Sequence, residues 1–144
     1  MAPDSRSVNS AISRRSFLRG AAQPENLVDV AAQRGLDTIA LCDRDGVYGA
    51  PRLHGRAKEH GISARVGAEL TMEDGSVVPV LVANRTGYQN LCRLITRAKL
   101  RGTKKESAVR WDELGEFAEG LLALTGDEDG AVVRSIDEED FATA

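Results

Sequence analysis

The sequence predicts an α/β domain built on a mostly parallel sheet. The chain has 144 residues, of which 42% are hydrophobic and 28% charged, as is typical of one soluble globular domain. Residues 38–42 form a continuous apolar run of the kind that parallel sheets bury on both faces. Predicted helices and strands alternate along the chain, as βαβ connections require.

The amino-terminal half contains two predicted helices and two predicted strands. Pro24 begins an amphipathic helix that Gly35 ends. The strand 38–42 follows, then a helix over 48–59 and a second strand over 62–70.

The carboxyl-terminal half is predicted to contain a hairpin-like turn, two strands and two helices. Pro79 lacks an amide donor, so its strand is predicted to lie at a sheet edge or to carry a bulge. The turn, the strands and the helices span residues 73–76, 77–83, 121–125, 87–99 and 111–119.

The two ends of the chain differ from its middle in composition. Residues 1–15 are predicted to be a disordered amino-terminal segment, and their twin arginines lack the apolar stretch of an export signal. Residues 127–144 carry seven acids and one base, which indicates a solvated acidic tail or, as an alternative, a protein-binding one. No run approaches the ~18 apolar residues of a membrane helix, so we expect a cytoplasmic protein without membrane contact.

Cysteine and histidine give little evidence of chemistry. Two cysteines exclude a disulfide scaffold and a four-cysteine zinc site. Cys42 is a soft ligand, a thiolate nucleophile or a buried strand residue, and the buried role is favoured; Cys92 is expected in the core. His54 and His60 lie about 120° apart on one predicted helix, so they do not converge on a metal.

Two acids stand where parallel sheets bind ligands. Asp43 follows the first strand and Glu69 ends the second. Because the carboxyl ends of parallel strands share one edge, the two carboxylates could hold a divalent cation or form an acid/base pair. Acids in such positions also cap the helix that follows, which is the structural alternative.

Longer blocks of the sequence resemble a known family. The blocks, in order, are FLRGAAQPENLVDVAAQRGLDTIALCDRDGVYGAPRLHGRAKEHGISARVGAEL, VLVANRTGYQNLCRLITRAKLRG and WDELGEFAEGLLALTG. They resemble the amino-terminal PHP (polymerase and histidinol phosphatase) domain of bacterial C-family DNA polymerase III alpha subunits, closest to the error-prone DNA polymerase type. The resemblance implies a distorted (β/α) barrel, which this chain would form only in part, as a truncated domain over residues 16–126.

The resemblance also implies a metal cluster of zinc, manganese, iron or magnesium, of which this chain keeps a remnant. The family's first two histidines fall on Ser10 and Ile12, and Arg44 stands at the histidine of the Thr-Asp-His motif. Asp43 and Glu69 remain as a vestigial metal site, with Glu69 in an intact Gly-x-Glu motif. We expect no bound metal, and we expect Arg44 to pair with one of the two acids in place of the ion.

A basic run along the helix 87–99 and the loop after it is a candidate contact for DNA or an adjacent polymerase domain; the alternative is a solvated helix face. The run consists of Arg93, Arg97, Lys99, Arg101, Lys104 and Lys105.

The resemblance implies a structural role in DNA synthesis during damage-associated replication and repair. The family is a DNA-directed DNA polymerase, but this chain is expected to be inactive alone. The expected partners are the remaining domains of a C-family DNA polymerase or other replication proteins, with indirect contact to DNA. The alternatives are a freestanding PHP-type metal-dependent phosphoesterase and a protein-interaction module that self-associates through an open sheet edge.

Overall fold

The computed structural model describes residues 23–102 and 107–142. The segment 1–15 that we predict to be disordered lies outside these residues, as do Lys104 and Lys105 of the basic run. In chain order the elements are α1 (Pro24–Gln33), β1 (Thr38–Arg44), α2 (Ala50–His60), β2 (Ser63–Thr71), β3 (Val77–Val82), α3 (Arg85–Arg101), α4 (Trp111–Glu116), β4 (Leu121–Ala123) and α5 (Ala131–Ala142).

Four strands form one sheet in the order β1-β2-β3-β4. Only β1 and β2 run parallel; β2–β3 and β3–β4 are antiparallel. The predicted mostly parallel sheet is therefore wrong, because the turn between β2 and β3 is too short for a crossover and forces a hairpin. The described strands form an open sheet with two edges, so the expected partial barrel is not confirmed.

Pro79 lies inside β3, between two paired strands, and not on an edge strand. Its carbonyl accepts a hydrogen bond from the amide of Leu124, 2.9 Å away, so the side of Pro79 that lacks a donor faces the β4 side of the sheet. The strand β4 pairs only with residues 80–82, so it stops before it would need that donor.

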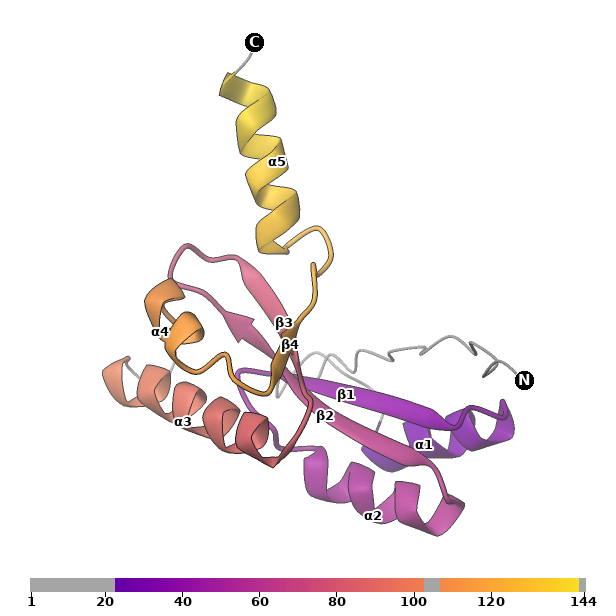
Figure 1. The fold of residues 1–144 in the computed structure, drawn as a ribbon. Helices are drawn as coiled ribbons and strands as arrows, with labels where there is room; N and C mark the ends of the chain where they lie inside the picture. Colours follow the sequence, from indigo (N-terminus) through magenta and orange to yellow (C-terminus); the bar gives the residue numbers. More distant parts are fainter. Residues whose placement is uncertain (1–22, 103–106, 143–144) are drawn as a thin grey trace, which may run out of the picture.

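The helices α1, α2 and α3 cover one face of the sheet (Figure 1). Ile39 and Leu41 of β1 pack with α1 and α2, whereas Leu70 and Val80 pack with α3. The strand register and the alternation of side chains put all four residues on the same face. Their burial, at about 25 cal/mol per Å² of apolar surface, gives the main stabilisation of the sheet.

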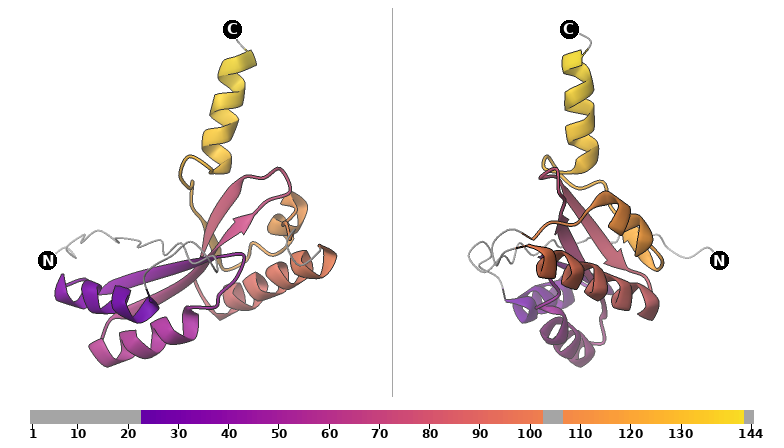
Figure 2. Two further views of the ribbon diagram at one scale, coloured as in Figure 1. Left: turned by 180° about the vertical axis from the view of Figure 1, so that it is seen from behind. Right: turned by 90° about the vertical axis from the view of Figure 1, so that its left-hand side faces the viewer.

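The helix α5 occupies the segment where the sequence predicts a solvated acidic tail. It projects away from the sheet and the other helices (Figures 1 and 2). Its base is fixed to the sheet, where the amide of Val77 donates to the carbonyl of Asp129 over 2.9 Å. A projecting helix buries little of its surface, which explains why its sequence shows no clear apolar periodicity.

None of the helices in the described part of the chain is long and apolar enough to cross a membrane.

Candidate functional site

The carboxyl ends of β1 and β2 form the edge where we expected Asp43 and Glu69 to meet. The register pairs Asp43 with Ala68 and Arg44 with Glu69. Successive side chains of a strand point to opposite faces, so Asp43 lies on the face covered by the helices and Glu69 on the other face. The sheet therefore does not bring the two carboxylates together.

Glu69 forms an ion pair with the arginine beside it. The Nε of Arg44 lies 3.2 Å from Oε2 of Glu69. Only 10% of the Glu69 side chain is exposed, against 30% of the Arg44 side chain. The predicted pairing of Arg44 with one of the two acids is confirmed, and Glu69 is the partner.

Asp43 holds the turn that leads into α2. It is 2% exposed, and its Oδ2 accepts a hydrogen bond of 2.7 Å from the amide of Gly49, the residue just before the helix. A side chain at Gly49 would force the buried Leu41 to shift, since its Cβ would lie 2.5 Å from Cδ2 of that residue. Asp43 thus has a structural role close to the capping alternative: it holds the amide of Gly49, the N-cap residue of α2, but is not itself the cap.

Asp45 closes the sharp turn after β1. Its backbone is left-handed, with φ of 50°, a conformation that aspartate tolerates better than most residues. Its two carboxylate oxygens accept hydrogen bonds of 2.8 Å from the amide and the hydroxyl of Thr71 at the end of β2. This turn keeps Arg44 beside Glu69.

Cys42 is a buried structural residue. Burial, together with the negative charges of Glu69 and Asp43, raises the pKa of its thiol to about 12. The thiol lies 3.9 Å from the carbonyl of Val80, to which it donates. A Cβ at Gly67, the first residue of the Gly-x-Glu motif, would come within 2.7 Å of the Cys42 sulfur and 2.2 Å of the same carbonyl, so only glycine fits there. A protonated, enclosed thiol is neither a nucleophile nor a metal ligand.

The donor set at this edge does not fit the metal cluster that the resemblance implies. A multinuclear site needs several carboxylate and imidazole donors on one side of the sheet. Within residues 23–102 and 107–142, no group of three or more His, Cys, Asp or Glu residues could hold a metal. His60, on α2, instead contacts Asp29 of α1, with 2.8 Å between Nε2 and Oδ1.

Neighbouring acids neutralise part of the predicted basic run. Arg97 forms an ion pair of 2.7 Å with Glu116, and Arg101 forms one with Glu113. The hydrogen bond from Arg101 holds the pKa of Glu113 below its usual range. These pairs attach α3 to α4. The charges of the two arginines are therefore already neutralised by acids of this chain and are less available to DNA phosphates.

Two other residues of the basic run, Lys99 and Arg93, lie in the described part of the chain, and their surroundings differ. Lys99 contacts the hydroxyl of Tyr48. Arg93 is exposed, and no ion pair is found for it within the described residues.

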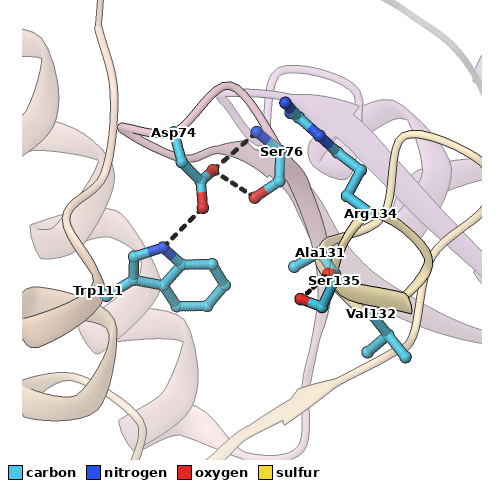
Figure 3. Close-up of a pocket in the computed structure, with 7 residues that line it drawn as sticks. All are labelled: Asp74, Ser76, Trp111, Ala131, Val132, Arg134 and Ser135. Atoms are coloured by element: carbon cyan, nitrogen blue, oxygen red, sulfur yellow. Dashed lines mark hydrogen bonds between the residues drawn. The ribbon is translucent and has the colours of Figure 1, made fainter. Parts of the chain in front are cut away.

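A small cavity of about 260 Å³ lies between the β2–β3 turn, α4 and α5 (Figure 3). Asp74 occupies one side of it and accepts hydrogen bonds from the Ser76 hydroxyl at 2.6 Å and from the Trp111 indole at 3.0 Å. Several interactions shift the pKa of Asp74, and the largest of them, the hydrogen bond from the Ser76 hydroxyl, lowers it. These bonds attach the turn to α4, so we assign this cavity to the packing of the fold.

Comparison with known proteins places these features in a family. The sequence model of the PHP domain matches residues 12–144. The error-prone DNA polymerase of Corynebacterium diphtheriae is 43% identical over 111 residues, which cover 77% of this chain and 10% of that protein. The error-prone DNA polymerase of Anaeromyxobacter sp. (strain K) is 39% identical over 134 residues, which cover 82% of this chain and 12% of that protein.

The chain therefore spans about a tenth of the length of these curated relatives. Among solved structures, a two-domain protein from Bacteroides vulgatus, described as containing a predicted PHP-like metal-dependent phosphoesterase, matches with a TM-score of 0.45 and 16% identity. The match covers 77% of this chain and 41% of that one. On the family match and the identity to the polymerases, the chain belongs to the PHP domain family.

Proposed function

We propose that this chain is a non-catalytic PHP domain that supports a C-family DNA polymerase during damage-associated DNA synthesis. The observation that carries the proposal is the ion pair between Arg44 and Glu69. Arg44 stands at the position of the family's histidine, and Glu69 belongs to the intact Gly-x-Glu motif. The guanidinium neutralises Glu69 permanently, which a titrating histidine would not do.

Loss of hydrolysis follows from the same pair. Metal-dependent hydrolysis of a phosphate ester needs ions that generate the nucleophile and neutralise the leaving oxygen. A guanidinium beside Glu69 repels such an ion, and Asp43 faces the other side of the sheet. Asp43 and Glu69 are thus proposed as vestiges of the metal site, used here for folding.

The similarity to error-prone polymerases supports the choice of partner. We propose that the remaining domains of such a polymerase contact this chain, in the cytoplasm. Co-purification with a C-family alpha subunit from the same cells would support this role. A chain that elutes alone and does not change the activity of that subunit would contradict it.

A self-associating interaction module is the second candidate. It is favoured by the edge strand β4, which spans only three residues and exposes 57% of Leu122. Such an edge can pair with a second copy of the chain. A concentration-dependent increase of mass in light scattering, lost on Leu122→Lys, would favour this candidate over the polymerase module.

The test of the non-catalytic assignment compares the wild type with Arg44→His. Both proteins are dialysed against zinc or manganese, and bound metal is measured by elemental mass spectrometry. We expect background metal in the wild type and a gain only in Arg44→His, because that variant removes the repelling cation and adds an imidazole. The matched control is Arg52→His on α2, which adds the same imidazole beside Glu25, 2.5 Å from the present arginine.

The assay of a model phosphoester, p-nitrophenyl phosphate, completes this test. The wild type should not hydrolyse it above the buffer rate. Near-stoichiometric metal in the wild type, or hydrolysis that disappears in Glu69→Gln, would revive the freestanding phosphoesterase and overturn the proposal.

A further inference from the structure

Three exposed apolar side chains lie around the cavity between α4 and α5. Trp111, at the start of α4, is 42% exposed, and Val132 and Ile136 of α5 are 49% and 57% exposed. Trp111 and Val132 line the cavity, and Ile136 lies one helical turn beyond Val132 (Figure 3). We call these three residues the α4–α5 patch. Apolar side chains that gather on a surface in this way mark a contact site, whereas scattered ones do not.

The helix α5 needs a contact that the part of the chain described by the structure does not supply. It has 12 residues, and isolated helices of this length are only marginally stable in water. Its first residue, Ala131, packs against the core, but the helix then projects away from the sheet and the other helices (Figures 1 and 2). Helices in proteins gain most of their stability by burying an apolar side, so we expect Val132 and Ile136 to be covered by a partner.

Trp111 is held in place with part of its ring exposed. Its indole nitrogen donates a hydrogen bond of 3.0 Å to Asp74, which also accepts one of 2.6 Å from the Ser76 hydroxyl. The polar atom of the ring is thus satisfied within this chain, so a partner that covers the ring does not bury an unpaired donor. A fixed tryptophan beside a cavity is typical of the residues that carry most of the binding energy in protein interfaces.

The charge around the patch indicates the chemistry of the partner. The segment 127–144, which contains α5, carries seven acids and one base. Such a segment repels nucleic acids and anionic membranes, and it attracts a basic protein surface. The cavity, at about 260 Å³, is smaller than ligand pockets of roughly 300–1,000 Å³. Its size suits one apolar side chain of a protein partner better than a separate small molecule.

We propose that the α4–α5 patch docks a basic, amphipathic helix from the remaining domains of a C-family DNA polymerase. One apolar side chain of that helix enters the cavity beside Trp111, and others cover Val132 and Ile136, as amphipathic helices do in apolar grooves. Basic residues that flank its apolar side face the acids of the segment 127–144. The proposal rests on the function proposed above, from which it takes the partner, and adds the surface where the two meet.

The test measures the binding of a purified C-family alpha subunit from the same cells by biolayer interferometry. Val132→Glu and Ile136→Glu each place a charge in the patch, and we expect each to weaken binding at least about tenfold. Both residues are exposed, so the thermal unfolding midpoint should stay near that of the wild type. The matched control is Val30→Glu on α1, where the valine is 45% exposed and lies outside the patch. It should change the affinity less than about twofold, because an exposed charge away from the interface is screened.

The dependence of binding on salt tests the charge of the docked helix. We expect the affinity of the wild type to fall severalfold as the salt concentration rises from about 0.05 M to about 0.5 M, because salt screens the attraction between the acids of this chain and a basic partner. An affinity that does not change with salt would overturn the basic helix as the occupant.

The remaining outcomes separate this inference from the proposed function. Full binding by both patch variants, or equal weakening by Val132→Glu and Val30→Glu, would overturn the docking surface and leave the polymerase partner in place. No binding of the alpha subunit by the wild type would overturn both. A mass that rises with concentration in light scattering, and no longer rises in Ile136→Glu, would assign the patch to a second copy of this chain and overturn the proposal.

Discussion

The two ends of β2 use arginine in opposite ways. At the carboxyl end, Arg44 forms an ion pair of 3.2 Å with the nearly buried Glu69. At the amino end, Arg65 is exposed, as is Arg85 at the start of α3, and among residues 23–102 and 107–142 no ion pair is found for either. The same type of side chain thus forms a partly buried ion pair at one end of the strand and is exposed to solvent at the other.

This difference shows that the density of basic residues in a sequence does not measure the charge that is available for binding. The run on α3 carries the highest density, yet Arg97 and Arg101 are neutralised by acids of α4. Arg65 and Arg85 stand twenty positions apart, and neither belongs to the basic run on α3. Three measurements test whether the carboxyl end is closed and the amino end open, and a fourth, at Asp74, gives a reference value from outside both ends.

The reactivity of Cys42 is expected to give the largest effect. Its thiol is enclosed at the closed end of β2, and its pKa is raised to about 12. In native protein at pH 8, alkylation of Cys42 by iodoacetamide should be at least about a hundredfold slower than alkylation of the half-buried Cys92. Mass spectrometry of timed samples measures both rates, and urea-unfolded protein, in which the two should react alike, is the control. Comparable native rates would mean that this end of the sheet is open.

Removal of Glu69 tests the ion pair between Arg44 and Glu69. Glu69→Ala removes the carboxylate that pairs with the partly buried guanidinium of Arg44. We therefore expect a loss of about 2–3 kcal/mol in the free energy of unfolding. Urea denaturation measures it. Glu116→Ala is the control, because it breaks the exposed pair with Arg97 and should cost less than about 1 kcal/mol. Equal losses would remove the contrast between a closed and an exposed ion pair.

Asp74 is a hydrogen-bonded carboxylate outside the two ends of β2, and it gives a reference value for them. Its folded pKa is lowered, chiefly by the Ser76 hydrogen bond, so its contribution to stability is present above the unfolded pKa and disappears as the pH falls through the folded value. Asp74→Asn should cost about 1 kcal/mol at pH 7 and flatten the decline in stability below about pH 4. Urea denaturation at a series of pH values measures both effects. Unchanged acid sensitivity would show that Asp74 does not titrate with folding.

The smallest effect is expected at the open end. Because Arg65 and Arg85 are exposed and no ion pair is found for them within the described residues, replacing either with Gln should change the free energy of unfolding by less than about 0.5 kcal/mol. Urea denaturation of the ligand-free protein gives this value. A loss comparable to that of Glu69→Ala would show that these arginines are structural. Arginine would then stabilise the fold at both ends of β2.

Most of the elements could be predicted from local patterns. The helix that begins at Pro24 and the strand that begins at Thr38 appear where the sequence predicts them, since proline position and apolar runs act within a few residues. The helix α5 was not predicted, because its segment shows no clear apolar periodicity in the sequence, and it projects from the body of the domain. The site was predicted in part: the motif positions predict that Arg44 pairs with Asp43 or Glu69, but neither the choice of Glu69 nor the separation of Asp43 from Glu69 follows from them.

The sequence by itself determined the family and the positions of its motifs, because those depend on residue types at fixed separations. It also determined that Gly67 and Glu69 stand together near the end of one strand. Only the tertiary structure decided which faces Asp43 and Glu69 occupy, since that depends on the register and the alternation of side chains in paired strands. It also decided which arginines are neutralised, because an ion pair depends on distance in space, and the partners of Arg97 and Arg101 come from another helix.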